Sequence, residues 1–591
     1  MCGIFGLVGA SPNGELCGAW VQSCMRLLEK RGPDAKGVVR TNRTVLGSRR
    51  LRVHDVSEAS DQPFESADNR FCLIFNGAIF NYRELREDLR LLGCHFRTTS
   101  DTEVLLHAIE YWWIDAPKKL KGMFAFAALD RKKKRLLIGR DAFGIKPLYL
   151  YRNPETLVFA SEIKPLLAYP GVRRKVAIER LPEQFAFQNL APPSTIFRDI
   201  NVLEPGRVLE VDVENISNTQ ETVWWQIDES IFDARCESDL KSMMKESIAQ
   251  CWDNDRKTCV HLSGGVDSSL IVALGDELDG KSPPDTHSVI FDDEKNIYSS
   301  SRSEEEYIRI VNAKYRCRSH LTSFDDELIS GALLQTIWKN EQPLYSANAV
   351  LYYLHAKEMY KHCTVVLSGE GADDIFLGYF DGQEITSKLP TLFPQYLSSE
   401  QLRALFGGRA KERAYEARST IVNSERLRGF TPPQKASALT IEVILHGLLA
   451  RQDRMFMSQS IEGRPAYCSL DLVKLRFQTP DHEIHAEKIG KRNIRALAAQ
   501  YFGNQFVSRK KRWLSGPVSD WCCSTKVWRN YVDSLDLDMF AQYMNPDPIR
   551  RVLALEDSPE KWSGPNLALI FSALNFGVWH RLFIEQQDTP E

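Results

Sequence analysis

Two glycine-rich turns, each between a short apolar segment and a helical one, constrain the fold more than any other sequence feature. Ser263–Ser269 follows the apolar run Thr258–Leu262 and precedes the helical run Leu270–Leu278. Ser368–Asp374 follows a second apolar run, Thr364–Leu367. Strands that alternate with helices form parallel sheets. We therefore expect an α/β unit with a parallel sheet from about residue 236 onward.

A strand, a glycine turn and a helix N-terminus together make a cradle for phosphate. Backbone N–H groups at the helix start have no partner within the helix, and glycine lets the backbone approach an anion closely. Neither turn contains the Gly-Lys-Ser/Thr sequence of the Walker loop. The two turns predict a phosphate site of another kind. The alternative is that Asp267 and Asp373 only cap helices.

The first part of the chain has a different pattern. Residues 1 to about 210 contain short apolar runs separated by Gly, Pro, Asn and Asp, which indicate strands and turns. Helical periodicity is confined to Gly18–Lys30 and Thr102–Trp113. We expect an α+β unit of packed sheets over residues 2–212, a linker over 213–235, and the α/β unit over 236–585. The expected strands are Phe71–Phe75, Phe124–Leu129, Arg135–Ile138, Thr156–Ala160 and Thr286–Phe291.

Cys2 directly follows the initiator methionine. A small second residue permits removal of that methionine, which would make cysteine the mature N-terminus. A free α-amino group has a pKa of about 7.7–8.0, so it can act as general base for the thiol of its own residue. Cys2 is therefore a candidate nucleophile, although many proteins have a small residue here without any catalytic role.

Further motifs follow Cys2 in a fixed order. They are Arg31-Gly32-Pro33-Asp34, Arg50-Leu51, Asn76-Gly77, Ser100-Asp101 and the run Gly139–Tyr149. With Cys2, this set resembles the N-terminal-nucleophile glutaminase domain of the glutamine-hydrolysing asparagine synthetase family. The resemblance implies an N-terminal-nucleophile sandwich in which Cys2 attacks the side-chain amide of glutamine.

The resemblance also implies roles for other residues of this part. Asn76 and the N–H of Gly77 would form the oxyanion hole. Arg50 would pair with the α-carboxylate of glutamine, and Asp101 would hold its α-ammonium. The alternative is that Arg50 and Asp101 are surface charges and that Asn76-Gly77 is a hairpin turn.

One position departs from the family pattern, which has Asn-Gly-Glu where this chain has Asn76-Gly77-Ala78. The missing carboxylate would help Asp101 to hold the glutamine ammonium. A lost hydrogen bond to a charged group costs about 1.5–3 kcal/mol. We expect weak glutamine binding, with free ammonia as an alternative donor.

The two glycine turns resemble the loops of an ATP pyrophosphatase domain, which splits ATP into AMP and pyrophosphate. The resemblance implies that Asp267 and Asp373 bind Mg²⁺ through hard carboxylate oxygens. The implied ATP-binding residues are Leu262, Ser263, Gly264, Gly265, Asp267, Ser268, Ile290, Ser368, Gly369 and Glu370.

Activation of a carboxylate by ATP also needs a base for the incoming ammonia and a cation for the transition state. By resemblance, Glu341 is the candidate base and Lys511 the candidate cation, with Lys510 as the alternative register. Glu462 and Arg464 could line the acceptor site or brace the fold. Directly afterwards, Pro465–Ser469 replaces the Val-Pro-Phe-Leu-Asp that is typical of the family, so the acceptor is open.

Composition limits the possible partners. The net charge is −3, which argues against a nucleic-acid or membrane surface. There is no signal peptide or apolar span. The thirteen cysteines are scattered without a Cys-x-x-Cys pair, which fits reduced thiols better than disulfides or zinc. The basic run Arg131–Arg135 is interpreted as a solvated turn. We expect a cytoplasmic protein, with a homodimer as the family resemblance allows.

These observations lead to one expected function. Glutamine, ATP and a carboxylic acid would react to give an amide, glutamate, AMP and pyrophosphate. Aspartate is the default acceptor. The alternatives are a specialised biosynthetic acid in place of aspartate, or a non-catalytic regulator with a synthetase-like fold.

Overall fold

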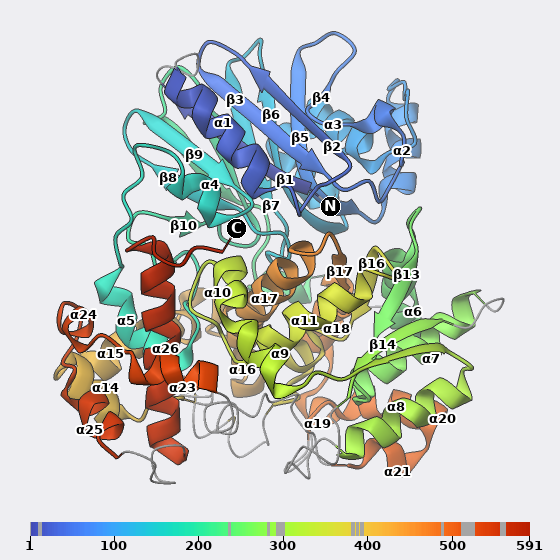
Figure 1. Cartoon of the computed structure of the whole chain (residues 1–591). Coiled ribbons are helices and arrows are strands. Elements are labelled where there is room, and N and C mark those ends of the chain that lie inside the picture. Colours follow the sequence, from blue (N-terminus) through green and yellow to red (C-terminus); the bar gives the residue numbers. More distant parts are fainter. Residues whose placement is uncertain are drawn as a thin grey trace.

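The computed structural model (Figure 1) describes residues 2–9, 15–233, 238–279, 284–290, 302–379, 385, 389, 395–485, 490–509, 526–555 and 563–590. In the view of Figure 1 the strands β1 to β12, with the helices α1 to α4, form the upper part of the molecule, while α5 and the elements from α6 onward form the lower part. Within the described residues, no helix combines the length and the apolar character needed to cross a membrane.

The upper part contains two six-stranded antiparallel sheets. The first has the order β10 (Asn201–Val202), β8 (Tyr149–Arg152), β9 (Thr156–Ala160), β1 (Cys2–Gly9), β3 (Thr44–Arg50) and β2 (Ala35–Arg40). The second has the order β12 (Thr219–Val223), β11 (Arg207–Asp212), β7 (Arg135–Arg140), β6 (Gly122–Asp130), β5 (Phe71–Ile79) and β4 (Phe64–Glu65).

Alternation along the strands explains how these sheets form layers. On β1, Ile4 and Val8 face the second sheet and join a core with Ile74 of β5. Phe5 of the same strand faces outward and meets Trp20 of α1 (Glu15–Leu27), with ring centroids 5.5 Å apart. Side chains of a strand alternate between its faces, so each sheet has two buried faces. The result is an α+β sandwich, as expected.

Short helices cover the outer faces of this sandwich. α1 and α4 (Ile163–Leu167) pack on the first sheet. α2 (Tyr82–Leu91) and α3 (Asp101–Trp112) pack on the second. The four layers place the start of β1, with Cys2, between the two sheets.

The lower part contains the expected parallel sheet. Its strand order is β15 (Arg318–Thr322), β14 (Asp285–Val289), β13 (Thr258–His261), β16 (Val365–Ser368) and β17 (Glu462–Pro465). On one face, Cys259 and Val366 pack against α11 (Asn348–Met359) and α17 (Leu445–Met457). On the other face, Val260 and Leu367 belong to the core that contains α7 (Val266–Asp279). The α/β prediction is confirmed.

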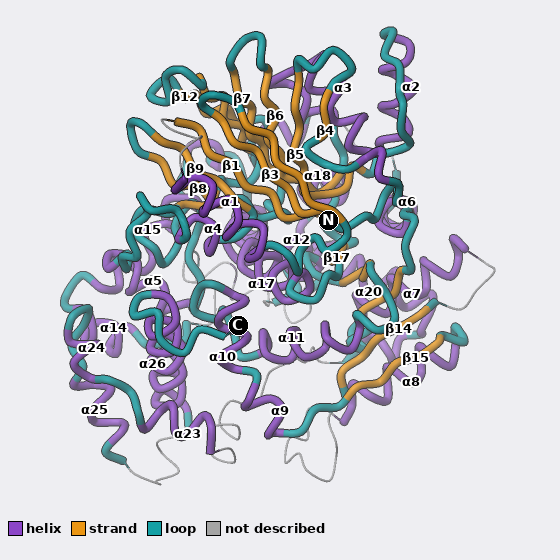
Figure 2. The backbone as a smooth tube through the Cα atoms, turned by 45° about the horizontal axis from the view of Figure 1, so that its top comes forward, coloured by secondary structure: helices purple, strands orange, loops and turns teal. Residues whose placement is uncertain are grey.

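Most other described residues of the lower part are helical (Figure 2). The remaining α-helices are α5 (Leu181–Phe187), α6 (Leu240–Trp252), α8 (Arg302–Lys314), α9 (Asp326–Gly331), α10 (Leu333–Asn340), α12 (Ala372–Phe376), α14 (Ser399–Phe406), α15 (Ala410–Val422), α16 (Pro432–Leu439), α18 (Leu470–Gln478), α19 (Asp481–Ile484), α20 (Arg492–Phe502), α21 (Asn504–Val507), α23 (Lys526–Asp533), α24 (Leu537–Ala541), α25 (Asp547–Leu553) and α26 (Gly564–Phe583).

Two local expectations differ from the structure. The segment 213–235, expected as a linker, contains β12, which pairs with β11 at the edge of the second sheet. Its polar sequence misled the prediction because an edge strand can keep most side chains in water. The thiols are also not all reduced: Cys259 and Cys363 form a disulfide with a Cα–Cα distance of 6.2 Å. These residues are 104 positions apart, so spacing gave no sign of the pair.

Buried charges join the upper and lower parts. Arg31 of the sandwich lies 2.8 Å from Asp453 of α17, and Lys146 lies 3.7 Å from the same carboxylate. Lys164 of α4 lies 3.1 Å from Glu341. The side chains of these five residues are at most 6% exposed. Because a buried charge without a partner is costly, these pairs fix how the two parts sit against each other.

Candidate active sites

The first site is formed around Cys2, which begins β1 opposite Arg50 of β3. The thiol is buried, and burial raises its pKa above the ordinary value, although the charge of Arg50 and the N–H of Leu51 act in the opposite direction. A thiol with a raised pKa is protonated at neutral pH and needs a base to become a nucleophile. The α-amino group that methionine removal would free is attached to the same residue.

Asn76 of β5 reaches across from the second sheet. Its Oδ1 accepts the N–H of Cys2 at 3.0 Å, which leaves Nδ2 pointing away from that bond. Nδ2 is buried and has no hydrogen-bond partner. An unpaired buried donor costs about 1–3 kcal/mol, and an oxyanion formed next to Cys2 would satisfy it. This geometry fits the expected oxyanion hole and excludes a hairpin turn, since Asn76 and Gly77 lie inside a strand.

The backbone at Gly77 leaves no room for a side chain. A Cβ at this position would lie 2.1 Å from the carbonyl oxygen of Met123. Gln62 is an additional residue of this site, and it belongs to none of the motifs identified in the sequence. Its Nε2 lies 3.8 Å from the Cys2 sulfur, and its Oε1 accepts the N–H of Phe75 at 2.7 Å. Gln62 therefore orients the thiol.

Arg50 and Asp101 are both buried near Cys2 but are already engaged. Arg50 donates to Asp61 at 2.7 Å and to the carbonyls of three neighbouring loop residues. Asp101 accepts the N–H of Ile79 at 3.0 Å. Because both residues are buried, the alternative interpretation, in which Arg50 and Asp101 are surface charges, does not hold. Binding a glutamine α-carboxylate at Arg50 would require it to exchange one of these partners.

The second site lies where β13 and β16 end. Ser263 and Ser268 bond to each other through their hydroxyls at 3.1 Å and close the first turn. Gly264 has φ of +78°, and a Cβ there would lie 2.7 Å from a carbonyl oxygen of α8. In the second turn, a Cβ at Gly369 would lie 3.2 Å from the Cβ of Asp267. The two glycine turns are therefore in contact and form one cradle.

The other residues implied for nucleotide binding surround this cradle. Leu262 is buried, and its N–H bonds to the carbonyl of His287. Ile290 lies just beyond the end of β14, where its N–H bonds to the carbonyl of Thr322. Both positions follow the carboxyl ends of parallel strands, the edge at which α/β sheets bind ligands.

Lys491 is a cation within this cradle that the sequence did not single out. Its Nζ lies 2.6 Å from Asp267 and 2.6 Å from Asp373. Burial lowers the pKa of Lys491, but the two carboxylates outweigh this and raise it above the ordinary value. Both carboxylates thus converge on one cation. Such a pair of hard oxygen donors fits Mg²⁺.

Glu370 of the second turn is not bound to Lys491. Its carboxylate accepts the hydroxyl of Tyr352 at 2.8 Å and a hydrogen bond from Arg451 at 2.8 Å. Its side chain is 14% exposed. Unlike Asp267 and Asp373, Glu370 lies at the edge of the cradle, where Tyr352 and Arg451 hold its carboxylate in place.

The segment that departs from the family pattern packs on both turns. The hydroxyl of Tyr467 donates to the carbonyl of Asp267 at 3.1 Å, and Cys468 Sγ lies 3.9 Å from the carbonyl of Glu370. The substitutions in Pro465–Ser469 therefore alter the direct surroundings of the cradle.

The contacts of Glu341, the expected base, are those of a residue that joins the two parts. Glu341 is fully buried and directly follows α10. Its carboxylate accepts the N–H groups of Ile163 and Lys164, at 2.7 and 2.9 Å, and so caps α4 of the sandwich. Burial would raise its pKa, but the charges of Lys164 and Arg454 hold the pKa below the ordinary value. Glu341 joins the two parts.

The expected cations Lys510 and Lys511 lie outside the described residues. Arg509, directly before them, donates to the carbonyl of Gly264 in the first turn and stacks over Tyr307 at 3.6 Å. The start of this basic run therefore lies at the phosphate cradle.

Glu462 and Arg464 brace the fold and do not line an open acceptor site. Both are fully buried, and they pair with each other at 2.6 Å. Arg464 also bonds to the ring of His54 at 3.2 Å, and that residue belongs to the sandwich. Its other donors bind the carbonyls of Cys251 and Asp253, at 3.0 Å each.

β17 connects the two sites. At its start, Glu462 is close enough to Cys2 to raise the pKa of the thiol. At its end, Pro465 lies beside Ser368 of the second turn. Three residue steps of a strand span about 10 Å.

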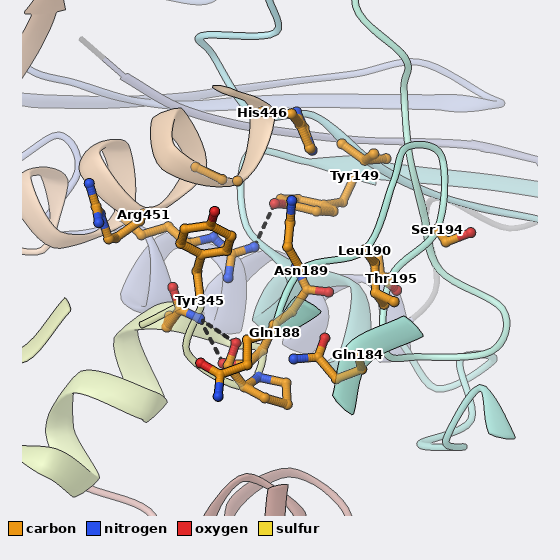
Figure 3. Close-up of a pocket in the computed structure, with 17 residues that line it drawn as sticks. Tyr149, Gln184, Gln188, Asn189, Leu190, Ser194, Thr195, Tyr345, His446 and Arg451 are labelled. Carbon is orange, nitrogen blue, oxygen red and sulfur yellow. Dashed lines mark hydrogen bonds between the residues drawn. The ribbon is translucent and has the colours of Figure 1, made fainter. Parts of the chain in front are cut away.

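A polar pocket lies between the two parts, beside Glu370 (Figure 3). β8 of the sandwich contributes Tyr149, the segment directly after α5 contributes Gln188 and Asn189, and α17 contributes His446 and Arg451. Figure 3 shows the ring of Tyr345 between Arg451 on one side and Tyr149 and Asn189 on the other. Arg451 also binds Glu370, so one side chain of the pocket contacts the second turn.

Comparison with known proteins gives two family matches. Residues 1–225 match the glutamine amidotransferase domain, and residues 239–581 match asparagine synthase. Asparagine synthetase 1 (glutamine-hydrolysing) of Bacillus subtilis is 27% identical, with 100% of this chain and 98% of that protein covered. Asparagine synthetase 3 of the same organism is 28% identical, covering 81% of each chain. A glutamine PRPP amidotransferase structure from B. subtilis gives a TM-score of 0.28 at 20% identity, covering 47% of this chain and 64% of that one.

The buried position of Glu341 leads to a stability prediction. Glu341→Gln removes the negative charge that Lys164 and Arg454 share and leaves Glu162, 3.4 Å from Lys164, as the remaining carboxylate of the cluster, so we expect a loss of about 3–5 kcal/mol in the free energy of unfolding. Urea unfolding measures this loss. The matched control is Glu425→Gln, since Glu425 and its partner Arg428 are 80% and 78% exposed, and little change is expected there. A Glu341→Gln protein of unchanged stability that fails to form amide would support the base role.

Proposed function

This chain belongs to the asparagine synthase family, and from that premise we propose a division of labour between its two parts. Residues 2–212 release ammonia from glutamine, and residues 236–585 use ATP to join that ammonia to a carboxylic acid. The products are an amide, glutamate, AMP and pyrophosphate. The observation that carries the proposal is the pair of sites in one chain: the unpaired Nδ2 of Asn76 next to Cys2, and the two glycine turns in contact at the ends of β13 and β16.

In the first reaction, the free α-amino group of the mature N-terminus takes the proton of the Cys2 thiol. The sulfur attacks the side-chain carbonyl of glutamine, and the negative charge that develops on oxygen is stabilised by the unpaired Nδ2 of Asn76. Ammonia leaves, and water then releases glutamate from the thioester. Gln62 holds the thiol in position.

In the second reaction, the two glycine turns bind the phosphates of ATP through backbone N–H groups. The acceptor carboxylate attacks the α-phosphorus, and pyrophosphate leaves. Lys491 and Arg509 supply positive charge beside the turns. Asp267 and Asp373 would hold Mg²⁺, which supplies charge neutralisation for the departing pyrophosphate.

We assign the base for the incoming ammonia to Glu370. Tyr352 and Arg451 fix its carboxylate at the edge of the cradle. A fixed carboxylate next to the acyl-adenylate can take the proton that ammonia loses on attack. The family's passage for ammonia would follow β17, because its first residue, Glu462, acts electrostatically on the Cys2 thiol and its last, Pro465, pairs with Ser368 of the second turn.

Aspartate is the acceptor that we propose, and asparagine the product. The relatives named above are asparagine synthetases over most of this chain. The remaining partners are small molecules, namely glutamine and ATP, and the family resemblance extends the proposal to a cytoplasmic homodimer.

The first experiment measures pyrophosphate release with Mg-ATP and aspartate, with either ammonium or glutamine as nitrogen donor. We expect asparagine with both donors. Because Ala78 lacks the carboxylate that would hold the glutamine ammonium, we expect a glutamine KM about ten- to a hundredfold above that of family members with Glu at this position. A glutamine KM in the family's usual range would contradict weak binding. Absence of release with ammonium would exclude aspartate as the acceptor and leave other carboxylic acids to be tested.

Asn76→Asp tests the oxyanion hole. The variant keeps an oxygen to accept from Cys2 but removes the Nδ2 donor, so we expect glutamine hydrolysis to slow by about 10²–10³-fold. Synthesis with ammonium as the donor should be unchanged. The control variant Cys2→Ser should likewise keep ammonium-dependent synthesis. Equal loss with both donors would mean that the variant disturbs the fold rather than the oxyanion hole.

Glu370→Gln separates activation from amide formation. The variant should still form the acyl-adenylate, seen as exchange of labelled pyrophosphate into ATP, while asparagine formation falls by about 10²–10⁴-fold. The control Asp267→Asn should lose both activities because it alters the phosphate cradle. If Glu370→Gln also abolishes exchange, Glu370 serves ATP binding and is not the base.

A further inference from the structure

Seven sulfur- and imidazole-bearing residues gather on one face of the parallel sheet, away from the nucleotide turns. Five of the twelve histidines of the chain take part. The set comprises Cys259, His261, His287, His320, His355, His362 and Cys363. None of the reactions proposed above uses any of them.

Strand register brings these residues together. In the parallel pairing, His287 of β14 lies beside His261 of β13 on one side and His320 of β15 on the other. Cys259 is two positions before His261 and so shares its face. Cys363 precedes β16, the strand on the other side of β13. Five separate segments thus meet at one place.

The atoms that could bind a metal are close together. The sulfurs of Cys259 and Cys363 and a ring nitrogen of His287 all lie within 4.8 Å of one another. His287 is 1% exposed, and neither of its ring nitrogens has a hydrogen-bond partner. A buried imidazole without any partner is costly, and a metal bound to one nitrogen would satisfy it.

A fourth ligand would come from one of two neighbouring imidazoles, whose ring would have to turn toward the ion because neither belongs to the set of atoms within 4.8 Å of one another. The ring of His320 stacks on His287 with centroids 4.4 Å apart, and its Nε2 is buried without a partner. His362 lies 4.1 Å from His320 by ring centroid and is exposed at the surface. The cluster therefore has a candidate fourth imidazole and a route by which an ion can enter.

We propose that Cys259, Cys363 and His287, completed by His320 or His362, bind one Zn²⁺ when the two cysteines are in the dithiol form. Two thiolates with two imidazoles are a donor set typical of structural zinc. The disulfide uses the same two sulfurs, so oxidation and metal binding exclude each other at this site.

The position of the site indicates what the metal would do. Cys259 stands four positions before Ser263 and Cys363 five before Ser368, so the ion would clamp the strands that lead into both phosphate turns. It would be a structural ion, separate from the cation held by Asp267 and Asp373, and its test does not depend on the proposed reaction.

The test is the metal content of the full-length protein purified under reducing conditions. We expect about one zinc per chain by elemental analysis. Replacement by Co²⁺ should give the absorption of a tetrahedral site with thiolate charge-transfer bands. Cys259→Ser and Cys363→Ser should each lose the metal. The matched control is Cys317→Ser, a half-buried cysteine next to β15 and outside the cluster, and it should keep a full equivalent.

His320→Gln and His362→Gln identify the fourth ligand, since only the ligand variant should change the Co²⁺ spectrum. Circular dichroism checks that each variant is folded, and the Co²⁺ spectrum of the unmodified protein tests the site even if the serine variants fail to fold. Reduced protein that binds no zinc or Co²⁺ added in excess would overturn the proposal. So would a folded Cys259→Ser, Cys363→Ser double variant that keeps its metal.

Discussion

Ion pairs buried between the two parts of the molecule determine the geometry on which everything else depends. Arg31 and Lys146 of the sandwich meet Asp453, and Lys164 meets Glu341, with almost no access to water. Removing one partner from such a pair leaves a buried charge without compensation. The sandwich therefore cannot shift relative to the helical part without a large cost in free energy. This fixed contact holds the start of β17 at Cys2 and its end at the second glycine turn.

The features that could be predicted from the sequence are local. A strand, a glycine turn and a helix lie within about fifteen residues of each other, so their order alone indicated both phosphate turns and the parallel sheet. Cys2 was predicted because of its distance from the initiator methionine. Asn76 and Gly77 could be assigned because the motif and the strand that carries it are continuous, and the unpaired Nδ2 of Asn76 agrees with that assignment.

The features that escaped prediction depend on pairing between distant segments. Glu341 was assigned from a short motif, but the partners that fix its role are on α4, about 180 positions earlier. Lys491 joins Asp267 to Asp373 across more than 200 residues. The Cys259–Cys363 pair and its histidines come from separate strands and one turn. In each case the sequence contains the residues, but it does not show that they lie next to each other. Their proximity results from the register of the sheet or from the docking of the two parts.

Electrostatics at the phosphate cradle constrains how ATP can enter it. Asp267 and Asp373 both lie 2.6 Å from the Lys491 ammonium, so their two negative charges are only partly compensated before any nucleotide arrives. A phosphate brought to within about 4 Å of either carboxylate meets a repulsion of about 4 kcal/mol per charge pair at an effective dielectric constant of 20. Lys491 alone cannot compensate two carboxylates and a triphosphate. The cradle is therefore built for a nucleotide that arrives with its own cation, which the two carboxylates then share with Lys491.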